Sequence, residues 1–343
     1  MTGRGSSGGS PSFLEEPRPP AKEFPLAVLS RRAPAVPGRA RPRPRPKPSR
    51  GRLLPYGLLL PATAVLGLVL GYPLVRLVII SFQDYGLRSL FTGETGWAGV
   101  DNYAKVLGDD QLVPVLLRSV GFCAALVAGT LVIGSAVALL LQRLGRRMRT
   151  AVTMSLITAW AIPNVASTVI WQWLFQPSYG VVNWLLSQVG FGDLTQRDWT
   201  TTPASAFVLV WLLVVWQSVP FVALTLYAGL SQIPRSYYEA ATLDGAGPLR
   251  VHLTITLPFL QPILGLVTIL SVIWDFTVFN QIWILTQGGP SGGTTTLGIW
   301  TFTRAFSTNS FGQGAAIAVV SVALLVGLTI VYVRKLVRSG EDL

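Results

Sequence analysis

The residues of this sequence best suited to chemistry are polar and aromatic side chains that interrupt long apolar stretches. Asp275 is the only acidic residue in any stretch long enough to cross a bilayer, and Trp274 stands directly before it. A sugar has apolar faces and hydroxyl edges that both donate and accept hydrogen bonds, so aromatic platforms beside carboxylate and hydroxyl groups suit it. Because an exposed polar group in lipid is costly, we expect these side chains to face a water-filled cavity.

Residues for catalysis or metal binding are scarce. His252 is the only histidine, so a zinc site or a Ser-His-Asp arrangement would have to be built around a single imidazole. Cys123 is the only cysteine, which excludes an internal disulfide and a cluster of thiolate ligands. The sequence therefore predicts no catalytic residue, no metal site and no cofactor, and an enzyme is not expected.

A loop that cradles the phosphates of ATP needs a glycine-rich turn ending in Lys followed by Ser or Thr. The four lysines are Lys22, Lys47, Lys105 and Lys335, and none of them follows a glycine. The chain cannot bind ATP by that mechanism. A transport process driven by ATP would have to use partner subunits that bind the nucleotide.

The composition places the chain in a membrane. Half of its 343 residues are hydrophobic and only 12% are charged, too few to cover a soluble globule of this size. Residues 1–52 hold 12 Lys and Arg against 3 Asp and Glu, so this segment carries +9 of the net charge of +12. Nothing after Arg52 resembles a basic groove with stacking aromatics, so no nucleic-acid partner is expected.

The apolar stretches predict the elements that must position the polar side chains. Crossing about 30 Å of hydrocarbon takes about 20 mostly apolar residues. We expect six such helices, at about 57–82, 113–141, 151–175, 204–230, 258–286 and 313–333. The expected fold class is an all-α membrane protein, with a six-helix transmembrane domain over 53–343 and a disordered Pro- and Arg-rich tail over 1–52.

The distribution of positive charge predicts the orientation, because loops in the cytoplasm retain Lys and Arg. The loops 142–150 and 231–257 and the C-terminal end hold 9 basic residues, whereas the loops on the other side hold 4. We therefore expect a multi-pass protein in lipid with both termini in the cytoplasm.

The loop 231–257 has a pattern that is too ordered for a simple linker. Residues 236–243 favour a short helix, and Gly245 and Gly247 interrupt it. Pro248 can begin a second short helix, and Pro258 is expected to begin the next spanning segment. We expect a helix-turn-helix at the cytoplasmic face that is suited to dock into a groove of a partner.

This loop also carries a family resemblance. Glu239-Ala-Ala-Thr-Leu-Asp-Gly-Ala followed by Ile255-Thr-Leu-Pro is similar to the signature loop of bacterial ABC importer permeases. The resemblance implies the type I importer permease fold, with a loop of coupling helices that seats in a cleft of the ATPase subunit. The residues to which it assigns this role are Glu239, Ala240, Ala241, Asp244, Gly245, Ala246, Leu257 and Pro258. The sequence departs from the family at His252, usually aromatic, and at Leu249, frequently tryptophan.

The resemblance implies the partners as well. They are a second permease subunit, two ATPase subunits that bind the ATP and an extracellular solute-binding protein, assembled at a bacterial inner membrane. The run from Leu285 to Leu297 resembles the branch of the family that includes maltose and glycerol-3-phosphate permeases. Aligned with the similar maltose permease, the candidate sugar contacts are Gln217, Ser218, Phe221, Ser271, Trp274 and Asp275.

Other interpretations remain open. The candidate contacts could instead hydrogen-bond to neighbouring helices without touching substrate. A permease for glycerol-3-phosphate or another polyol derivative belongs to the same class, but a phosphate favours cationic groups, which the candidate positions lack. An ion-coupled secondary transporter would need further charges within the membrane and duplicated halves, and the sequence offers only Asp275 and no duplication.

Overall fold

The computed structural model describes residues 54–341. The chain divides into two units, residues 1–60 and 61–343, and the described part of the first is the beginning of α1. The predicted Pro- and Arg-rich tail lies outside the described residues.

The elements before the first long buried helix are short. The chain runs in order through α1 (Leu54–Leu66), the π-helical turn η2 (Gly67–Gly71), α2 (Tyr72–Ser81), β1 (Gln83–Asp84), α3 (Leu87–Thr92), β2 (Gly96–Trp97) and α4 (Asp101–Leu107). The two strands pair antiparallel, with Gln83 opposite Trp97.

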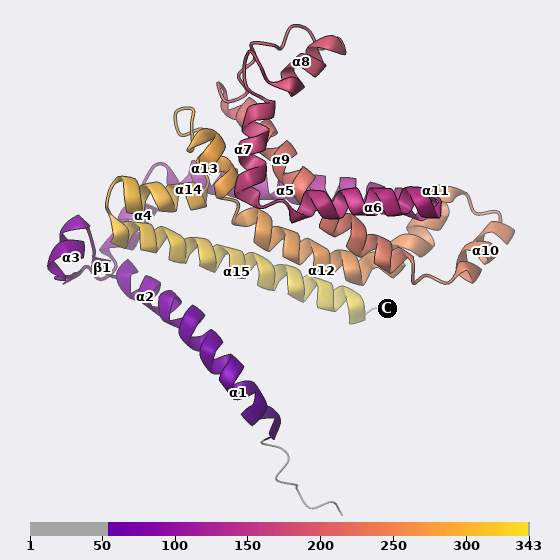
Figure 1. Cartoon of the computed structure of the whole chain (residues 1–343). Coiled ribbons are helices and arrows are strands. Elements are labelled where there is room, and N and C mark those ends of the chain that lie inside the picture. Colours follow the sequence, from indigo (N-terminus) through magenta and orange to yellow (C-terminus); the bar gives the residue numbers. More distant parts are fainter. Residues whose placement is uncertain (1–53, 342–343) are drawn as a thin grey trace, which may run out of the picture. The chain divides into compact units, whose positions relative to one another are not determined.

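The rest of the described chain is helical (Figure 1). Its elements are α5 (Leu112–Arg143), α6 (Arg146–Ala161), α7 (Asn164–Leu174), α8 (Val181–Gln188), α9 (Pro203–Leu230), α10 (Arg235–Leu243), α11 (Pro248–Val251), η3 (His252–Thr256), α12 (Leu257–Phe276), α13 (Asn280–Thr286), α14 (Leu297–Phe302), η4 (Thr303–Ser307) and α15 (Phe311–Glu341).

Five stretches within the described residues are long and apolar enough to cross a membrane. They are Tyr56–Ser81, Leu112–Arg143, Pro203–Leu230, Pro248–Thr286 and Phe311–Arg334. The predicted single helix at 151–175 is wrong, because α6 and α7 meet there at an angle of 101°. Pro163 disfavours helical geometry at the preceding residue, and Ile162 has extended torsions of −71° and 126°. The described residues contain a sixth span only if α6 and α7 together are counted as one span.

Pro258 does not begin a helix, contrary to the prediction. The helix begins at Pro248 and continues through η3 and α12. A proline inside an α-helix clashes with the carbonyl four residues earlier, here that of Thr254. That carbonyl belongs to the π-helical turn of η3, whose wider winding makes room for the ring.

Helix α9 is the centre of the packing, with 15 buried residues. It lies closely against α5, where Gly129 sits under the indole ring of Trp211 and a Cβ at that glycine would lie 2.3 Å from the ring. The Trp211 indole nitrogen donates a hydrogen bond of 2.9 Å to the Ala125 carbonyl. Small residues allow such close approach between membrane helices, where water exclusion contributes little.

Two further regions are tied by polar contacts. In the first, the beginning of α5 meets the segment 287–310, where the Ser119 hydroxyl accepts a hydrogen bond of 2.8 Å from the Leu297 amide. Arg118 donates to the Gly292 carbonyl. Just before α5, Asp109 forms an ion pair with Arg304.

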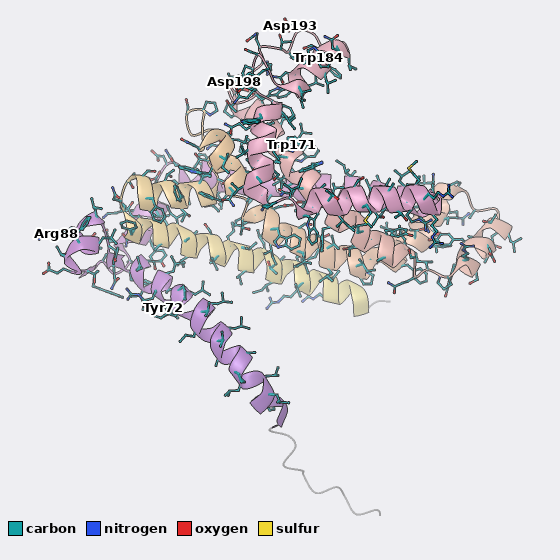
Figure 2. All side chains as sticks on the ribbon, viewed as in Figure 1. Tyr72, Arg88, Trp171, Trp184, Asp193 and Asp198 are labelled. Atoms are coloured by element: carbon teal, nitrogen blue, oxygen red, sulfur yellow. The ribbon has the colours of Figure 1, made fainter. Side chains whose placement is uncertain are left out.

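The segment between α7 and α9 is held by Asn183, which is fully buried. Its amide donates to the Phe175, Gln176 and Arg197 carbonyls, and its oxygen accepts from Trp199. Figure 2 marks Asp193 at the far end of this segment. Two hydrogen bonds from Thr195 lower the pKa of the Asp193 carboxyl.

Candidate translocation site

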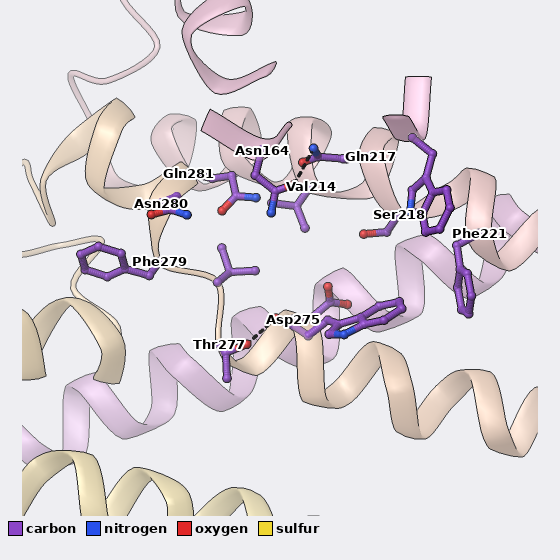
Figure 3. A pocket seen from close by; sticks show the side chains of 13 residues that line it. Asn164, Val214, Gln217, Ser218, Phe221, Asp275, Thr277, Phe279, Asn280 and Gln281 are labelled. Carbon is purple, nitrogen blue, oxygen red and sulfur yellow. Dashed lines mark hydrogen bonds between the residues drawn. The ribbon is translucent and has the colours of Figure 1, made fainter. Parts of the chain in front are cut away.

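A cavity of about 340 Å³ is enclosed by residues of α6, α7 and α9 and by the region where α12 ends and α13 begins (Figure 3). It is lined by Trp160, Asn164, Val214, Gln217, Ser218, Phe221, Trp274, Asp275, Thr277, Val278, Phe279, Asn280 and Gln281. Its side chains come from three separate stretches of the sequence, which only the folded chain brings together.

Breaks in the helices converge on this cavity. Helices α6 and α7 separate at Ile162 and Pro163, and α12 and α13 separate at 277–279. Pro220 lies in α9 between the lining residues Gln217 and Phe221. Because proline has no amide hydrogen, it removes one of the backbone hydrogen bonds of the helix there. Non-helical backbone at membrane depth is tolerated where it is buried in protein or lines a water-filled cavity. The arrangement therefore fits a hydrated pathway.

Asp275 is the charged side chain of the cavity. It is 5% exposed, and its Oδ2 atom has no hydrogen-bond partner among the described residues. In Figure 3 its carboxylate points from α12 toward α9, where Ser218 lines the opposite wall. A buried acceptor without a partner costs about 1–3 kcal/mol. A ligand that donates a hydrogen bond at this position would recover that cost.

Gln217 is engaged with its own chain. Its amide nitrogen lies 2.7 Å from Asn164 Oδ1, 3.1 Å from Ser167 Oγ and 3.3 Å from the Ile162 carbonyl. All three partners belong to the break between α6 and α7 or to the turn that follows it. Gln217 therefore holds this break against α9, besides lining the cavity.

Three aromatic rings form one wall of the cavity. The ring of Phe221 lies 6.2 Å from that of Trp160 at an interplanar angle of 28°, and 5.1 Å from that of Trp274 at 69°. The rings come from α6, α9 and α12. Such a wall offers the apolar faces on which a sugar ring can stack.

The structure brings five of the six predicted substrate contacts to the cavity. Gln217, Ser218, Phe221, Trp274 and Asp275 line it. Ser271 is buried in α12 and does not line it.

The sequence reasoning missed Trp160 and Asn164, because it placed them inside a continuous helix. The pair Pro163-Asn164 was the available signal, since proline disfavours a helical residue before it and Asn often begins a helix.

The predicted docking loop forms a separate surface around α10. Ile233 and Tyr238 pack into the cluster formed with α9 and α12, and the ring of Tyr237 lies 5.2 Å from that of Phe259. Leu243 and Leu249 are 89% and 71% exposed. An anchored element that leaves large apolar side chains in the open is typical of a surface that binds a partner.

Hydrogen bonds explain the residue types at the turn of this loop. Helix α10 ends with the Ala246 amide donating to the Ala241 carbonyl at 2.9 Å and the Gly245 amide donating to the Thr242 carbonyl at 3.1 Å. This pattern is a Schellman motif, which places the next-to-last residue of the motif in the left-handed region. Gly245 takes that position with φ of 73°.

The other predicted coupling residues lie on or beside this turn. Glu239, Ala240 and Asp244 are exposed. Leu257 and Pro258 are exposed in the first turn of α12, on the helix that continues from Pro248. Within the described residues, no three His, Cys, Asp or Glu side chains gather in a way that could hold a metal ion.

Residues 114–339 match the family described as the binding-protein-dependent transport system inner membrane component. The chain belongs to this family. Its membership confirms the predicted resemblance to ABC importer permeases. It also identifies this inner membrane component as a permease and not an enzyme.

Known relatives align over most of the inner membrane component. It is 44% identical over 292 residues to the diacetylchitobiose uptake system permease protein DasB of Streptomyces coelicolor, covering 85% of this chain and 89% of the relative. It is 37% identical over 290 residues to the sulfoquinovosyl glycerol transport system permease protein SmoG of Agrobacterium fabrum, covering 84% and 92%.

A solved structure shows the same fold. It is a bacterial ABC transporter involved in the import of the acidic polysaccharide alginate, and it superposes with a TM-score of 0.72 at 19% identity. The match covers 84% of this chain and 96% of that one. The predicted fold class, a helical importer permease, is confirmed by this likeness.

Proposed function

We propose that this inner membrane component forms one half of the translocation pathway for a sugar or oligosaccharide in an ATP-driven importer. The observation that carries the proposal is the cavity in which the wall of Trp160, Phe221 and Trp274 faces the unpartnered carboxylate of Asp275. Relatives that transport diacetylchitobiose and sulfoquinovosyl glycerol support the carbohydrate class. In this proposal the predicted contacts that line the cavity touch the substrate or shape its path, namely Gln217, Ser218, Phe221, Trp274 and Asp275.

The importer would be completed by partners. A second permease forms the other half of the pathway, two ATPase subunits bind the ATP, and an extracellular solute-binding protein delivers the sugar. The α10 surface is the proposed seat of the ATPase, with coupling residues Glu239, Ala240, Ala241, Asp244, Gly245, Ala246, Leu257 and Pro258. Motion of the ATPase would reach the cavity along the continuous helix from Pro248 to Phe276.

The proposed orientation places both termini and the 231–257 loop in the cytoplasm of a bacterial cell. Helix α9 has 28 residues and is therefore about 42 Å long, which exceeds the hydrocarbon thickness. Its two ends lead to the α10 surface and to the α8 segment, so these lie on opposite faces of the membrane. The solute-binding protein would approach from the α8 side. Residues 53–343 form the permease domain in this proposal, preceded by the tail at 1–52.

The alternatives fit the cavity less well. A permease for glycerol-3-phosphate would need cationic groups for the phosphate, and the side chains that line the cavity include none. An ion-coupled secondary transporter would need no docking surface for an ATPase. The exposed and anchored α10 surface therefore favours the importer.

The proposal is tested by uptake of labelled N,N′-diacetylchitobiose and maltose in cells that carry this chain with its neighbouring transport genes. We expect uptake of at least one saccharide that depends on the chain and on ATP hydrolysis. Uptake that persists after the gene is deleted, or a dependence that is confined to compounds other than saccharides, would contradict the proposal.

A further inference from the structure

We propose that Asp275 makes the cavity selective for the charge of the saccharide, so that neutral saccharides enter and anionic ones are excluded. The inference rests on the proposed function, because it assigns the substrate class of the same cavity. The inference goes beyond the proposed function by naming one side chain that decides between neutral and anionic sugars of similar size.

The first observation is that the carboxylate stands alone in the cavity. The remaining lining side chains are uncharged, namely those of Trp160, Asn164, Val214, Gln217, Ser218, Phe221, Trp274, Thr277, Val278, Phe279, Asn280 and Gln281. Asp275 is 5% exposed, and its Oδ2 atom has no hydrogen-bond partner in the described part of the chain. A substrate in the cavity therefore meets an acceptor that no neighbouring side chain occupies.

The second observation is that no basic residue on the surrounding helices offsets this charge. Helices α7, α9, α12 and α13 contain no Lys or Arg. On α6 the nearest basic residue to the lining Trp160 is Arg149, eleven positions earlier. Its guanidinium donates to the carbonyls of Leu141 and Leu144 at the end of α5. On α5, which packs against α12, Arg118 donates to the Gly292 carbonyl.

When it is ionised, the Asp275 carboxylate acts strongly on a charged ligand, because no basic side chain neutralises it. Two like charges about 5 Å apart in surroundings with an effective dielectric constant of about 20 repel by an amount that weakens binding roughly 200-fold. A hydroxyl or amide N–H of a neutral sugar instead donates to the free acceptor. The same fold serves an acidic polysaccharide in the alginate importer, so the fold alone does not set the charge of the substrate.

The experiment uses the purified, assembled importer without its solute-binding protein, because that protein imposes a selectivity of its own. Binding of three labelled disaccharides is measured by scintillation proximity: neutral N,N′-diacetylchitobiose, its deacetylated cationic form, and a disaccharide of equal size with one hexuronate. Asp275→Asn removes the charge and keeps an acceptor. Asp193→Asn is the matched control, since it removes an exposed carboxylate far from the cavity lining.

We expect the wild-type importer and Asp193→Asn to bind the anionic disaccharide at least 10-fold more weakly than the neutral one. Asp275→Asn should bring the two within about 3-fold. Equal binding of neutral and anionic disaccharides by the wild type would overturn the charge selection. An unchanged preference for the neutral disaccharide in Asp275→Asn would overturn it as well. Either result leaves the importer proposal standing. If that variant does not assemble, the wild-type ratio decides. Binding of none of the three saccharides overturns both proposals.

Discussion

The side-chain amide of Gln217 lies 2.7 Å from the Oδ1 atom of Asn164, which joins the middle of α9 to the first residue of α7. This hydrogen bond crosses the break between α6 and α7, and both side chains also line the cavity. A change in the angle of the break would therefore change the shape of the cavity. The pair links the backbone geometry of the proposed pathway to its polar wall.

The pair should be energetically coupled. Gln217→Ala and Asn164→Ala are each expected to lower the free energy of unfolding by about 1–3 kcal/mol, because buried polar partners lose their hydrogen bonds. In the double variant the losses should fall short of the sum by at least about 0.5 kcal/mol. The measurement is unfolding in detergent micelles. Gln232→Ala is the control, since its exposed amide reaches only the Ala228 carbonyl of its own turn. Strictly additive losses would show that the two side chains act independently.

The exposed carboxylate of Glu239 on α10 should be needed for association with the ATPase. Glu239→Lys reverses the charge of a residue that packs against nothing in the core, so we expect normal insertion, weakened recovery of the ATPase subunits and loss of uptake. Glu94→Lys is the control, because it makes the same reversal at an exposed residue between α3 and β2. Co-purification and uptake give the measurement. Full recovery of the complex from Glu239→Lys would remove this residue from the docking role.

The turn after α10 should depend on one glycine and not on its neighbour. Gly245 has φ of 73°, whereas Gly247 has φ of −69° and open space around the position of a Cβ. Gly245→Ala is expected to strain the turn by about 1–3 kcal/mol and reduce uptake. Gly247→Ala should leave uptake near the wild-type level. Equal effects of the two substitutions would mean that the left-handed turn does not matter for coupling.

The sequence predicted those elements whose cause is local. Apolar length placed four of the five long spans within a few residues, and the Gly245 and Pro248 pattern placed the end of α10 and the start of α11. The span that ends at Thr286 begins at Pro248, ten residues before the predicted start. The bend between α6 and α7 was missed although Pro163 marks it, because the apolar stretch 151–175 is long enough for one span. The hydrogen bonds of Gln217 to this break come from more than 50 residues away. Local propensity does not contain such a contact.

The limits of the sequence are also visible at Pro258 and at the cavity. A proline usually marks a helix start, but here the π-helical turn before it lets the helix continue. Asp275 and Trp274 could be chosen from residue type, because a carboxylate within a membrane span needs a polar environment. Trp160 could not, because an exposed aromatic on a spanning helix looks the same whether lipid or a cavity faces it.

The tail over residues 1–52 gives a prediction from the sequence alone. Deleting residues 1–45 should preserve insertion and uptake, because Lys47, Arg50 and Arg52 remain before the first span to mark the cytoplasmic side. Immunoblotting of membranes and sugar uptake give the measurement. A large loss of uptake with normal insertion would assign a function to the tail.

The aromatic wall should govern affinity for the sugar more than stability. Phe221 lies between Trp160 and Trp274, so removing either the central ring or an outer one opens the wall. Because an aromatic contact contributes about 0.5–1.5 kcal/mol beyond its buried area, Trp274→Ala and Phe221→Ala should each weaken sugar binding about 3- to 10-fold.

The control is Trp173→Ala on α7, since this ring is 69% exposed and does not line the cavity. Binding to the assembled importer is measured together with expression and basal ATPase activity, which should stay near wild type. The substitutions remove no hydrogen bond that holds the α6 and α7 break, so a stacking role predicts weaker binding at normal assembly. Loss of assembly at unchanged affinity would instead assign the wall to helix packing, and the sugar pathway would then have to lie elsewhere in the chain.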